Sequence, residues 1–275
     1  MKNQLPVCIS YSGGTSSRWV IEAMIRGVIP RPQHVAVFSA QTGEEHSWTY
    51  VDMNEVEVVC RNAGLLFTKC YHPKHSSLGN HILEAVSSGA TRMDNPPFYI
   101  DKGGSRGQIG QRCSREFKTY PIRRAVSKWL KSIRMPKRVE AWIGFAADEL
   151  NRAQKALAKR DVQWETLDFP GIRYGRTRAM QRAELTAWIG HAPKFSMCTF
   201  CPHKTPERWA ATEGKDLERA IEVDENIRNL DEFGLTDGPA YLSDRLVPIS
   251  KLPRYNASSD DLRGTDGCEG GRCFL

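Results

Sequence analysis

The chain has 275 residues, of which 40% are hydrophobic and 26% are charged, as in ordinary globular proteins. This length allows a large buried core, which excludes disorder over most of the chain. The net charge of +7 favours anionic ligands such as nucleotides, sulfate esters or nucleic acid, without choosing among them.

The chain contains no apolar stretch near the roughly eighteen residues that cross a membrane. Its apolar N-terminal run, in MKNQLPVCISYSGG, is too short for a secretory signal and passes directly into a glycine turn. We therefore expect a soluble, cytoplasmic protein with no membrane partner. The eight cysteines are then not expected to form disulfides, and Cys8, Cys60 and Cys70 are interpreted as structural.

Patterns typical of strands and helices alternate along the first part of the chain. Apolar runs predict strands at residues 7–10, 34–40, 65–71 and 139–144. Helical spacing predicts helices at residues 18–27, 47–60, from residue 78, at 118–133 and at 148–160. Such alternation predicts a doubly wound α/β fold, with a mostly parallel sheet that binds ligands at the carboxyl ends of its strands.

The remaining segments divide the chain into two predicted regions. Residues 90–111 are polar and glycine-rich, which predicts a long loop or lid over a site. The α/β pattern is expected to end after residue 160, followed by a helix after Thr177 and a long helix at 209–229. We expect an α/β nucleotide-binding domain at 1–165 and a helical, cysteine-rich metal-binding region at 166–275 packed against it.

The segment ISYSGGTSSRWV follows the first predicted strand. Gly13 and Gly14 allow a tight turn, and Ser12, Ser16 and Ser17 place hydroxyls at a helix N-terminus. Backbone amides that converge in such a turn can hold a phosphate. A plain strand-to-helix turn explains the same residues equally well.

Two further segments combine charged side chains with a turn or a cysteine. In QRCSREFKTYPIRRAV, Lys118 and the arginines could bind phosphate or sulfate and lower the pKa of the Cys113 thiol. The alternative is an amphipathic helix with a basic solvent-exposed face. In WIGFAADELNRAQ, Asp148 and its acidic neighbour are also explained as residues that begin a helix.

The C-terminal third contains four more cysteines, in KFSMCTFCPHKTPERW and GCEGGRC. The spacing of Cys198 and Cys201 lets two sulfurs reach one metal ion or cluster. Zinc would take four cysteines, or three with His203, whereas a 4Fe-4S cluster would take four thiolates. Soft thiolates suit both metals, so ligand type does not separate them.

In this order, the motifs resemble the PP-loop superfamily, and within it the phosphoadenosine phosphosulfate (PAPS) reductase-like family. This phage and bacterial group is adenine nucleotide alpha hydrolase-like and is related to DNA phosphorothioation and tRNA thiolation enzymes. The likeness rests on a Ser-Gly-Gly-x-Thr-Ser loop, a Thr-Gly-x-Glu segment, a Cys, Lys and Pro segment and a Gly-x-x-x-Asp-Glu-x-x-Arg segment. Ser16 replaces the loop's Asp or Thr, and Phe117 replaces the first basic residue of the cysteine segment.

The resemblance implies ligands and site residues. An adenosine nucleotide, either ATP with Mg or the sulfonucleotides PAPS or APS, would be bound by Ser10, Ser12, Gly13, Gly14, Thr15, Ser16, Ser17, Phe38, Ala40, Thr42, Gly43, Glu44, Gly144, Asp148 and Arg152. A 4Fe-4S iron-sulfur cluster, with zinc as the alternative, would be held by Cys113, Cys198, Cys201 and Cys268. Cys113, Lys118 and Cys273 would be catalytic. For Glu44, a solvent-exposed acid at the start of a helix is the alternative interpretation.

Three functions agree with these features. The first is adenylation-dependent sulfur transfer to, or modification of, a nucleic acid or nucleotide, with DNA or tRNA, a sulfur-donor or reductant protein, or a second copy of the chain as partners. The second is sulfonucleotide reduction, with Cys273 as nucleophile, although the ending GCEGGRCFL departs from the short C-terminal motif of those reductases. The third is a zinc-stapled nucleic-acid-binding protein without catalysis.

Overall fold

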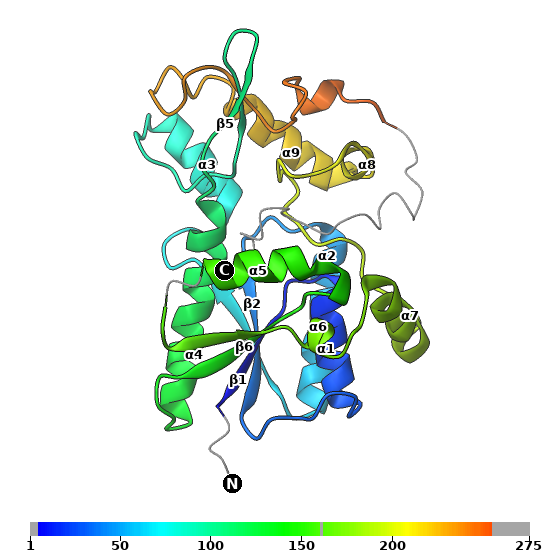
Figure 1. The fold of residues 1–275 in the computed structure, drawn as a ribbon. Coiled ribbons are helices and arrows are strands. Elements are labelled where there is room, and N and C mark those ends of the chain that lie inside the picture. The colour runs from blue at the N-terminus through cyan, green and yellow to red at the C-terminus, as the bar shows by residue number, and fades with distance from the viewer. Residues whose placement is uncertain (1–4, 160–161, 255–275) are drawn as a thin grey trace.

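The computed structural model describes residues 5–159 and 162–254 and is built around one parallel sheet (Figure 1). The strands are β1 (Val7–Ser10), β2 (Val35–Gln41), β3 (Leu66–Tyr71), β6 (Val139–Ile143) and β7 (Glu165–Asp168). They lie in the order β3-β2-β1-β6-β7, and every neighbouring pair is parallel. This confirms the predicted α/β fold with a mostly parallel sheet.

Helices cover both faces of this sheet, because its strands are apolar on both sides. Val7 and Ile9 of β1 face a core shared with α1 (Thr15–Ile25), α2 (Ser47–Asn62) and α7 (Arg178–Ile189). Cys8, between them, faces a core shared with α4 (Tyr120–Ser132) and α5 (Leu150–Ala158). A short helix, α6 (Pro170–Arg173), follows β7. No helix in the described part of the chain is long and apolar enough to span a membrane.

A second core lies above the carboxyl ends of the strands in the view of Figure 1. It contains residues between 78 and 117 and residues between 198 and 252, so it mixes segments from before and after the expected boundary near residue 165. Its elements are α3 (Leu78–Ser87), β4 (Tyr99–Asp101), β5 (Arg106–Gln108), α8 (Pro206–Ala210), α9 (Gly214–Asn226), β8 (Ala240–Tyr241) and the 3-10 turn η3 (Ile249–Lys251).

Three sequence-based expectations about elements are wrong. Residues 90–111 do border a pocket, but they are not loop throughout, because β4 and β5 form a hairpin that pairs with the distant β8. The single helix expected at 209–229 is two helices, separated before Gly214, whose φ is +54°. The α/β pattern does not end after residue 160, because β7 adds a fifth strand. Glu165 is buried in that strand by its ion pair with Arg123, which hydrophobic periodicity does not reveal.

The strand order determines where a ligand would bind. The chain runs from β1 outward to β2 and β3 on one side, and β6 and β7 occupy the other side. The order therefore reverses between β1 and β6, and the loops that follow these two strands border a crevice at their carboxyl ends. The second core lies on the same side of the sheet (Figure 1).

Candidate functional site

The loop between β1 and α1 is fixed by its own hydrogen bonds. Gly13 has a φ of +82°, and a Cβ there would lie 2.4 Å from Thr49 Cγ2, so only glycine fits. Ser17 Oγ accepts a hydrogen bond from the Ser12 amide at 3.2 Å and donates to the Gly14 carbonyl at 3.0 Å. These contacts hold the chain as it enters α1, where backbone amides suit an anion.

Ser16 lies in the first turn of α1, and its hydroxyl is buried with no hydrogen-bond partner among the described residues. Its neighbour Thr15 donates its hydroxyl to the Pro193 carbonyl at 3.2 Å. Buried hydroxyls in native proteins almost always have a partner. The unsatisfied Ser16 hydroxyl lies at a helix N-terminus, where phosphate groups often bind, but Ser16 lines neither of the two pockets described below.

Gly144, after β6, packs directly against this loop. A Cβ at Gly144 would lie 2.4 Å from the Ser17 amide nitrogen and 2.7 Å from the Ser16 carbonyl carbon. The absence of a side chain therefore lets β6 approach the start of α1. Any larger residue at position 144 would push the loop after β1 away from β6.

Asp148 and Arg152 follow β6 but are engaged elsewhere. Asp148 lies in the 3-10 turn η2 (Ala147–Glu149), and its Oδ1 accepts a hydrogen bond from the Arg178 amide at 3.1 Å. Arg152 forms an ion pair with Glu149 and lies over the Phe145 ring, 4.7 Å from its centroid. Neither residue lines the two pockets described next.

The first pocket, here named the sheet pocket, lies between the sheet and the start of α4. Its lining surface is largely apolar; Ser10, Tyr11 and Ser12 lie where β1 ends, whereas the ion pair of Arg123 and Glu165 lies level with the start of β1. Its lining includes Ser10, Tyr11, Ser12, Ala40, Glu45, Lys118, Ile122, Arg123, Ala141, Ile143, Glu165 and Leu167. A largely apolar pocket with a few polar groups suits a small ligand such as a nucleotide.

The second pocket, here named the cysteine pocket, contains three of the predicted metal ligands. Cys113 precedes the π-helix η1 (Arg115–Thr119), while Cys198 and Cys201 lie in a turn before α8 in which the Cys201 amide donates to the Cys198 carbonyl at 3.1 Å. The other lining residues include Ser12, Thr42, Gln111, Lys118 and Ser196. The fold thus brings together cysteines separated by 85 residues or more in the chain.

Ser12 and Lys118 line both pockets. Ser12 belongs to the loop after β1, and Lys118 lies in η1, which is anchored by the fully buried Phe117 stacked on His72 with ring centroids 4.5 Å apart. The two pockets therefore meet at a hydroxyl and a cation. A ligand in one pocket would have its polar end next to the other.

Cys198 is a neutral thiol in the absence of a metal ion. Burial raises the pKa of Cys198 to about 12, although the positive charge of Lys118 opposes this shift. Thr42 Oγ1 lies 3.3 Å from Cys198 Sγ. A metal ion would bind Cys198 as the thiolate, and the positive charge of the ion would stabilise that thiolate in the buried site.

The three sulfurs, as they stand, are too far apart to bind a single zinc ion together. Tetrahedral zinc holds sulfurs about 3.8 Å apart, since each Zn–S bond is about 2.3 Å. Among the described residues, Cys113, Cys198 and Cys201 do not form a group whose ligand atoms all lie within 4.8 Å of one another. In an iron-sulfur cluster each cysteine binds a different iron, which requires a wider arrangement.

The remaining predicted ligands are not part of this pocket. Cys268 and Cys273 lie outside the described residues, so their roles stay predictions. His203 is half-buried and lines neither pocket. Phe38, expected beside the adenosine, is buried on the α4 face of the sheet against Trp129, with ring centroids 5.7 Å apart, and also lines neither pocket.

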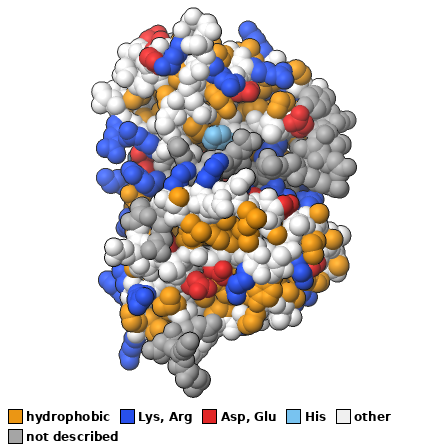
Figure 2. All heavy atoms as spheres, in the orientation of Figure 1, with side chains coloured by type: hydrophobic (Ala, Val, Ile, Leu, Met, Phe, Trp, Pro, Cys, Tyr) orange, Lys and Arg blue, Asp and Glu red, His pale blue; other side chains and the backbone are white. Residues whose placement is uncertain are grey.

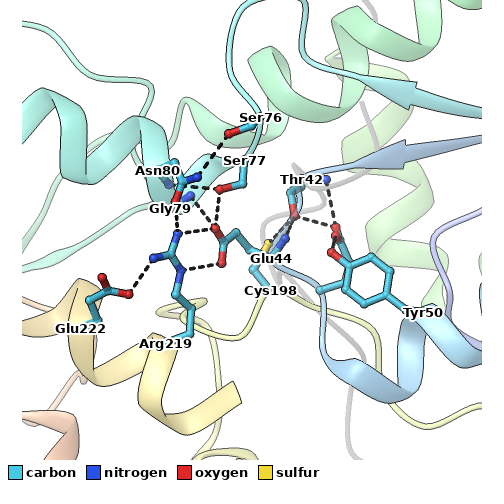
Figure 3. A network of polar contacts seen from close by, with 11 residues as sticks. Thr42, Glu44, Tyr50, Ser76, Ser77, Gly79, Asn80, Cys198, Arg219 and Glu222 are labelled. Atoms are coloured by element: carbon cyan, nitrogen blue, oxygen red, sulfur yellow. Dashed lines mark hydrogen bonds and ion pairs between the residues drawn. The ribbon is translucent and has the colours of Figure 1, made fainter. Parts of the chain in front are cut away.

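The loop after β2 divides its residues between site and scaffold. Thr42 lines the cysteine pocket and donates its hydroxyl to Glu45 Oε1 at 2.7 Å. Gly43 has a φ of +76° and packs against Ser77. Glu44 points away from both pockets, toward Ser77, Gly79 and Arg219 (Figure 3).

Sequence reasoning missed three residues of the site. Glu45 lines the sheet pocket, and only its position beside Glu44 could have indicated it. Ser196 donates its hydroxyl to the Ser12 carbonyl and thereby joins the turn that carries Cys198 to the loop after β1. Nothing in the sequence around Ser196 indicates this contact.

The third missed residue is Lys204, which is buried next to the turn that carries Cys198 and Cys201. Its Nζ donates to the Thr199 carbonyl at 2.5 Å and to Thr212 Oγ1 at 2.8 Å. Burial lowers the pKa of Lys204 to about 7, while the two cysteines and Asp216 act to raise it. At neutral pH Lys204 is therefore only partly protonated, and it lines neither pocket.

Comparison with known proteins adds one structural likeness. The chain matches no family model, and no curated protein matches it at a significant level. Among solved structures it is similar to the U34-tRNA thiolase NcsA from Methanococcus maripaludis with its 4Fe-4S cluster. The TM-score is 0.42 and the sequence identity 13%, over 84% of this chain and 67% of that chain. A likeness of this degree does not identify a function.

Proposed function

We propose that this chain is a PP-loop enzyme of the PAPS reductase-like kind, which binds an adenosine nucleotide in the sheet pocket and an iron-sulfur cluster in the cysteine pocket. One observation carries the proposal: Ser12 and Lys118 line both pockets. A nucleotide and a cysteine-held cluster would thus meet at a hydroxyl and a cation. This juxtaposition is what a reaction between the two would require.

The nucleotide would place its base in the apolar part of the sheet pocket, beside Ala40, Ile143 and Leu167. Its phosphates would contact the amides after Ser12 and the unsatisfied hydroxyl of Ser16. Lys118 would supply positive charge at the phosphate end. Magnesium is expected if the nucleotide is ATP, because triphosphates bind with this ion.

The cluster would be held by Cys113, Cys198 and Cys201, with Cys268 as the fourth ligand. The presence of all three cysteines in the lining of one pocket supports this assignment. Thr42 Oγ1 lies 3.3 Å from Cys198 Sγ and would stabilise the thiolate if its proton turned from Glu45 Oε1 to this sulfur. Such hydrogen bonds and nearby charges tune the potential of a cluster.

The activity that these parts support best is adenylation-dependent sulfur transfer to, or modification of, a nucleic acid or nucleotide. Bound ATP would transfer its adenylyl group to an acceptor oxygen with release of pyrophosphate, and sulfur from a donor would then displace AMP from the acceptor. The cluster would supply a site for handling this sulfur. Lys118 would stabilise negative charge on the phosphates at the junction of the pockets. A sulfur donor or reductant protein would be needed as partner.

The test is anaerobic purification, followed by measurement of iron, sulfide, zinc and the visible absorption spectrum. We expect iron and sulfide with a broad visible band, lost in Cys198→Ser and Cys201→Ser. Cys60→Ala is the matched control, because Cys60 is buried in the core shared by α1, α2 and α7 and does not line the cysteine pocket. Stoichiometric zinc without iron would contradict the cluster and favour a zinc-stapled nucleic-acid-binding protein.

Nucleotide preference is tested by titration calorimetry of the same protein with ATP, APS and PAPS. We expect ATP with magnesium to bind more tightly than either sulfonucleotide. Tighter binding of APS or PAPS, with sulfite release that Cys273→Ser abolishes, would contradict adenylation and identify a sulfonucleotide reductase. Absence of binding by all three would contradict the assignment of the sheet pocket.

A further inference from the structure

A basic surface with exposed aromatic rings flanks α4 on both sides. One hollow lies between α4 and the segment that leads into β7, and a second lies between α4 and β3; Arg124 and Lys128 line both. We name this region the α4 surface and define it by Tyr71, Tyr120, Arg124, Lys128, Lys137 and Trp164. Lys and Arg side chains gather along this edge of the molecule, at the left of Figure 2.

The cations of the α4 surface are not neutralised by the described part of the protein. Arg124, Lys128 and Lys137 are exposed, and none forms an ion pair with a described residue. Among the described residues that line the two hollows, the one acid is Glu116. Its Oε1 lies 3.2 Å from Arg115 Nε, with which it forms an ion pair. Cations placed side by side without acids repel one another, so the α4 surface is complementary to an anionic partner.

The rings of the α4 surface are presented to solvent on both sides of these cations. Tyr71 is 60% exposed, and Tyr120 is 39% exposed with Arg115 Cζ over one face of its ring, 5.4 Å from the centroid. Trp164 is half-buried, and Lys137 Nζ lies 5.0 Å from its ring centroid. Exposed rings between unpaired cations are the arrangement that binds single strands, because bases stack on rings while cations contact phosphates.

The α4 surface also leads to the sheet pocket. Arg123 lines both the sheet pocket and the hollow that contains Tyr120 and Trp164. It is held there by Glu165, with Nη2 and Oε2 at 2.8 Å. A chain lying along α4 would therefore pass next to the proposed nucleotide site.

We propose that the α4 surface binds single-stranded nucleic acid. Arg124, Lys128 and Lys137 contact phosphates, while the exposed rings stack on unpaired bases. A duplex fits this surface less well, because its bases are stacked on one another and present no free face to Tyr71 or Tyr120. The delivery of an acceptor to the sheet pocket rests on the proposed function, whereas the binding of the strand does not.

The experiment measures binding of a fluorescein-labelled single-stranded RNA of mixed sequence to the full chain by fluorescence anisotropy, at several salt concentrations. Arg124→Ala/Lys128→Ala removes two phosphate contacts and should reduce the slope of log K against log salt by about 1.4. Tyr120→Ala removes one stacking ring and should weaken binding about tenfold at constant slope. Lys215→Ala/Lys251→Ala, which removes two exposed charges elsewhere, is the matched control and should bind as the unaltered chain does.

Three results would overturn the proposal: unchanged binding by Arg124→Ala/Lys128→Ala, equal weakening by the control pair, or tighter binding of a duplex of the same sequence. ATP binding by the same variants, measured by calorimetry, separates this proposal from the previous one. If strand binding depends on the α4 surface while the chain binds no nucleotide, the proposed function fails and this inference stands. If the chain binds ATP but does not bind the strand, this inference fails and the proposed nucleotide site stands.

Discussion

Arg219 of α9 binds Glu44, in the loop after β2, through a two-point ion pair: Nε lies 3.0 Å from Oε2, and Nη2 lies 2.8 Å from Oε1. Glu44 is buried and also accepts hydrogen bonds from Ser77 Oγ at 2.6 Å and the Gly79 amide at 3.0 Å. Its own carbonyl accepts from the Thr199 amide at 2.7 Å. One residue thus joins the sheet, α3, α9 and the turn that carries Cys198 (Figure 3).

Removing the cation of this ion pair should destabilise the protein. Arg219→Met leaves the buried Glu44 carboxylate without its ion partner, which should lower the free energy of unfolding by about 2–4 kcal/mol. Glu222→Gln is the control, because Glu222 is about half exposed and pairs with the same arginine at 2.7 Å, so its loss should cost about 0.5 kcal/mol. Urea denaturation followed by circular dichroism measures both, and equal effects would contradict a structural role for Glu44.

Substitution of two neighbouring serines at the start of α1 should affect different properties, namely ATP affinity for Ser16 and stability for Ser17. Ser16→Ala removes a buried hydroxyl that has no partner among the described residues, so stability should not fall, while ATP affinity should drop by about tenfold. Ser17→Ala removes the hydroxyl that bonds the Ser12 amide and the Gly14 carbonyl, so stability should fall by about 1 kcal/mol. Thermal unfolding and calorimetry measure the two quantities. A stability loss for Ser16→Ala without a change in affinity would exclude it from the phosphate site.

Gly144→Ala should damage the loop after β1 although Gly144 has an ordinary backbone conformation. The added methyl group would lie 2.4 Å from the Ser17 amide nitrogen, so β6 or the start of α1 must move. Overpacking of this kind costs about 1–3 kcal/mol, and ATP binding should be lost with it. Gly110→Ala is the control, because nothing lies within 4 Å of a Cβ there. Retained ATP binding in Gly144→Ala would show that the loop tolerates this movement.

Acid should destabilise the fold through His46. Burial and the positive charge of Lys204 lower the pKa of His46 from 6.5 to about 4, and its Nδ1 lies 2.9 Å from Asp216 Oδ2. Between these two pKa values the unfolded chain binds a proton that the folded chain does not, so stability falls as pH falls. From pH 7 to pH 5 this group should cost about 2 kcal/mol.

The check for His46 is urea denaturation of the unaltered chain and of His46→Asn at pH 7 and pH 5. The asparagine keeps a polar contact to Asp216 but does not titrate, so the loss of stability between the two pH values should be smaller by about 2 kcal/mol. His34→Asn, which changes a partly exposed histidine before β2, should leave the pH dependence unaltered. The same pH dependence in all three proteins would locate the acid sensitivity elsewhere.

Local patterns in the sequence were sufficient for much of the fold. Apolar runs predicted β1, β2, β3 and β6, because buried parallel strands are apolar on both faces. The glycines after β1 predicted the turn that Gly13 makes with its positive φ. The hairpin of β4 and β5 was missed, because these strands are only three residues long and are stabilised by β8, more than a hundred residues later.

The sequence by itself determined the alternation of β1, β2, β3 and β6 with their helices, the turn after β1 and the Cys-x-x-Cys turn, since each of these depends on residues close together in the chain. Only the tertiary structure decided that Cys113 lies with Cys198 and Cys201, that Ser12 and Lys118 join two pockets, and that Glu44 serves the scaffold. The predicted role of a residue depends on its type and near neighbours, whereas its contacts depend on how distant segments pack. Glu44 and Arg219 lie 175 residues apart, and no local pattern in the chain encodes their meeting.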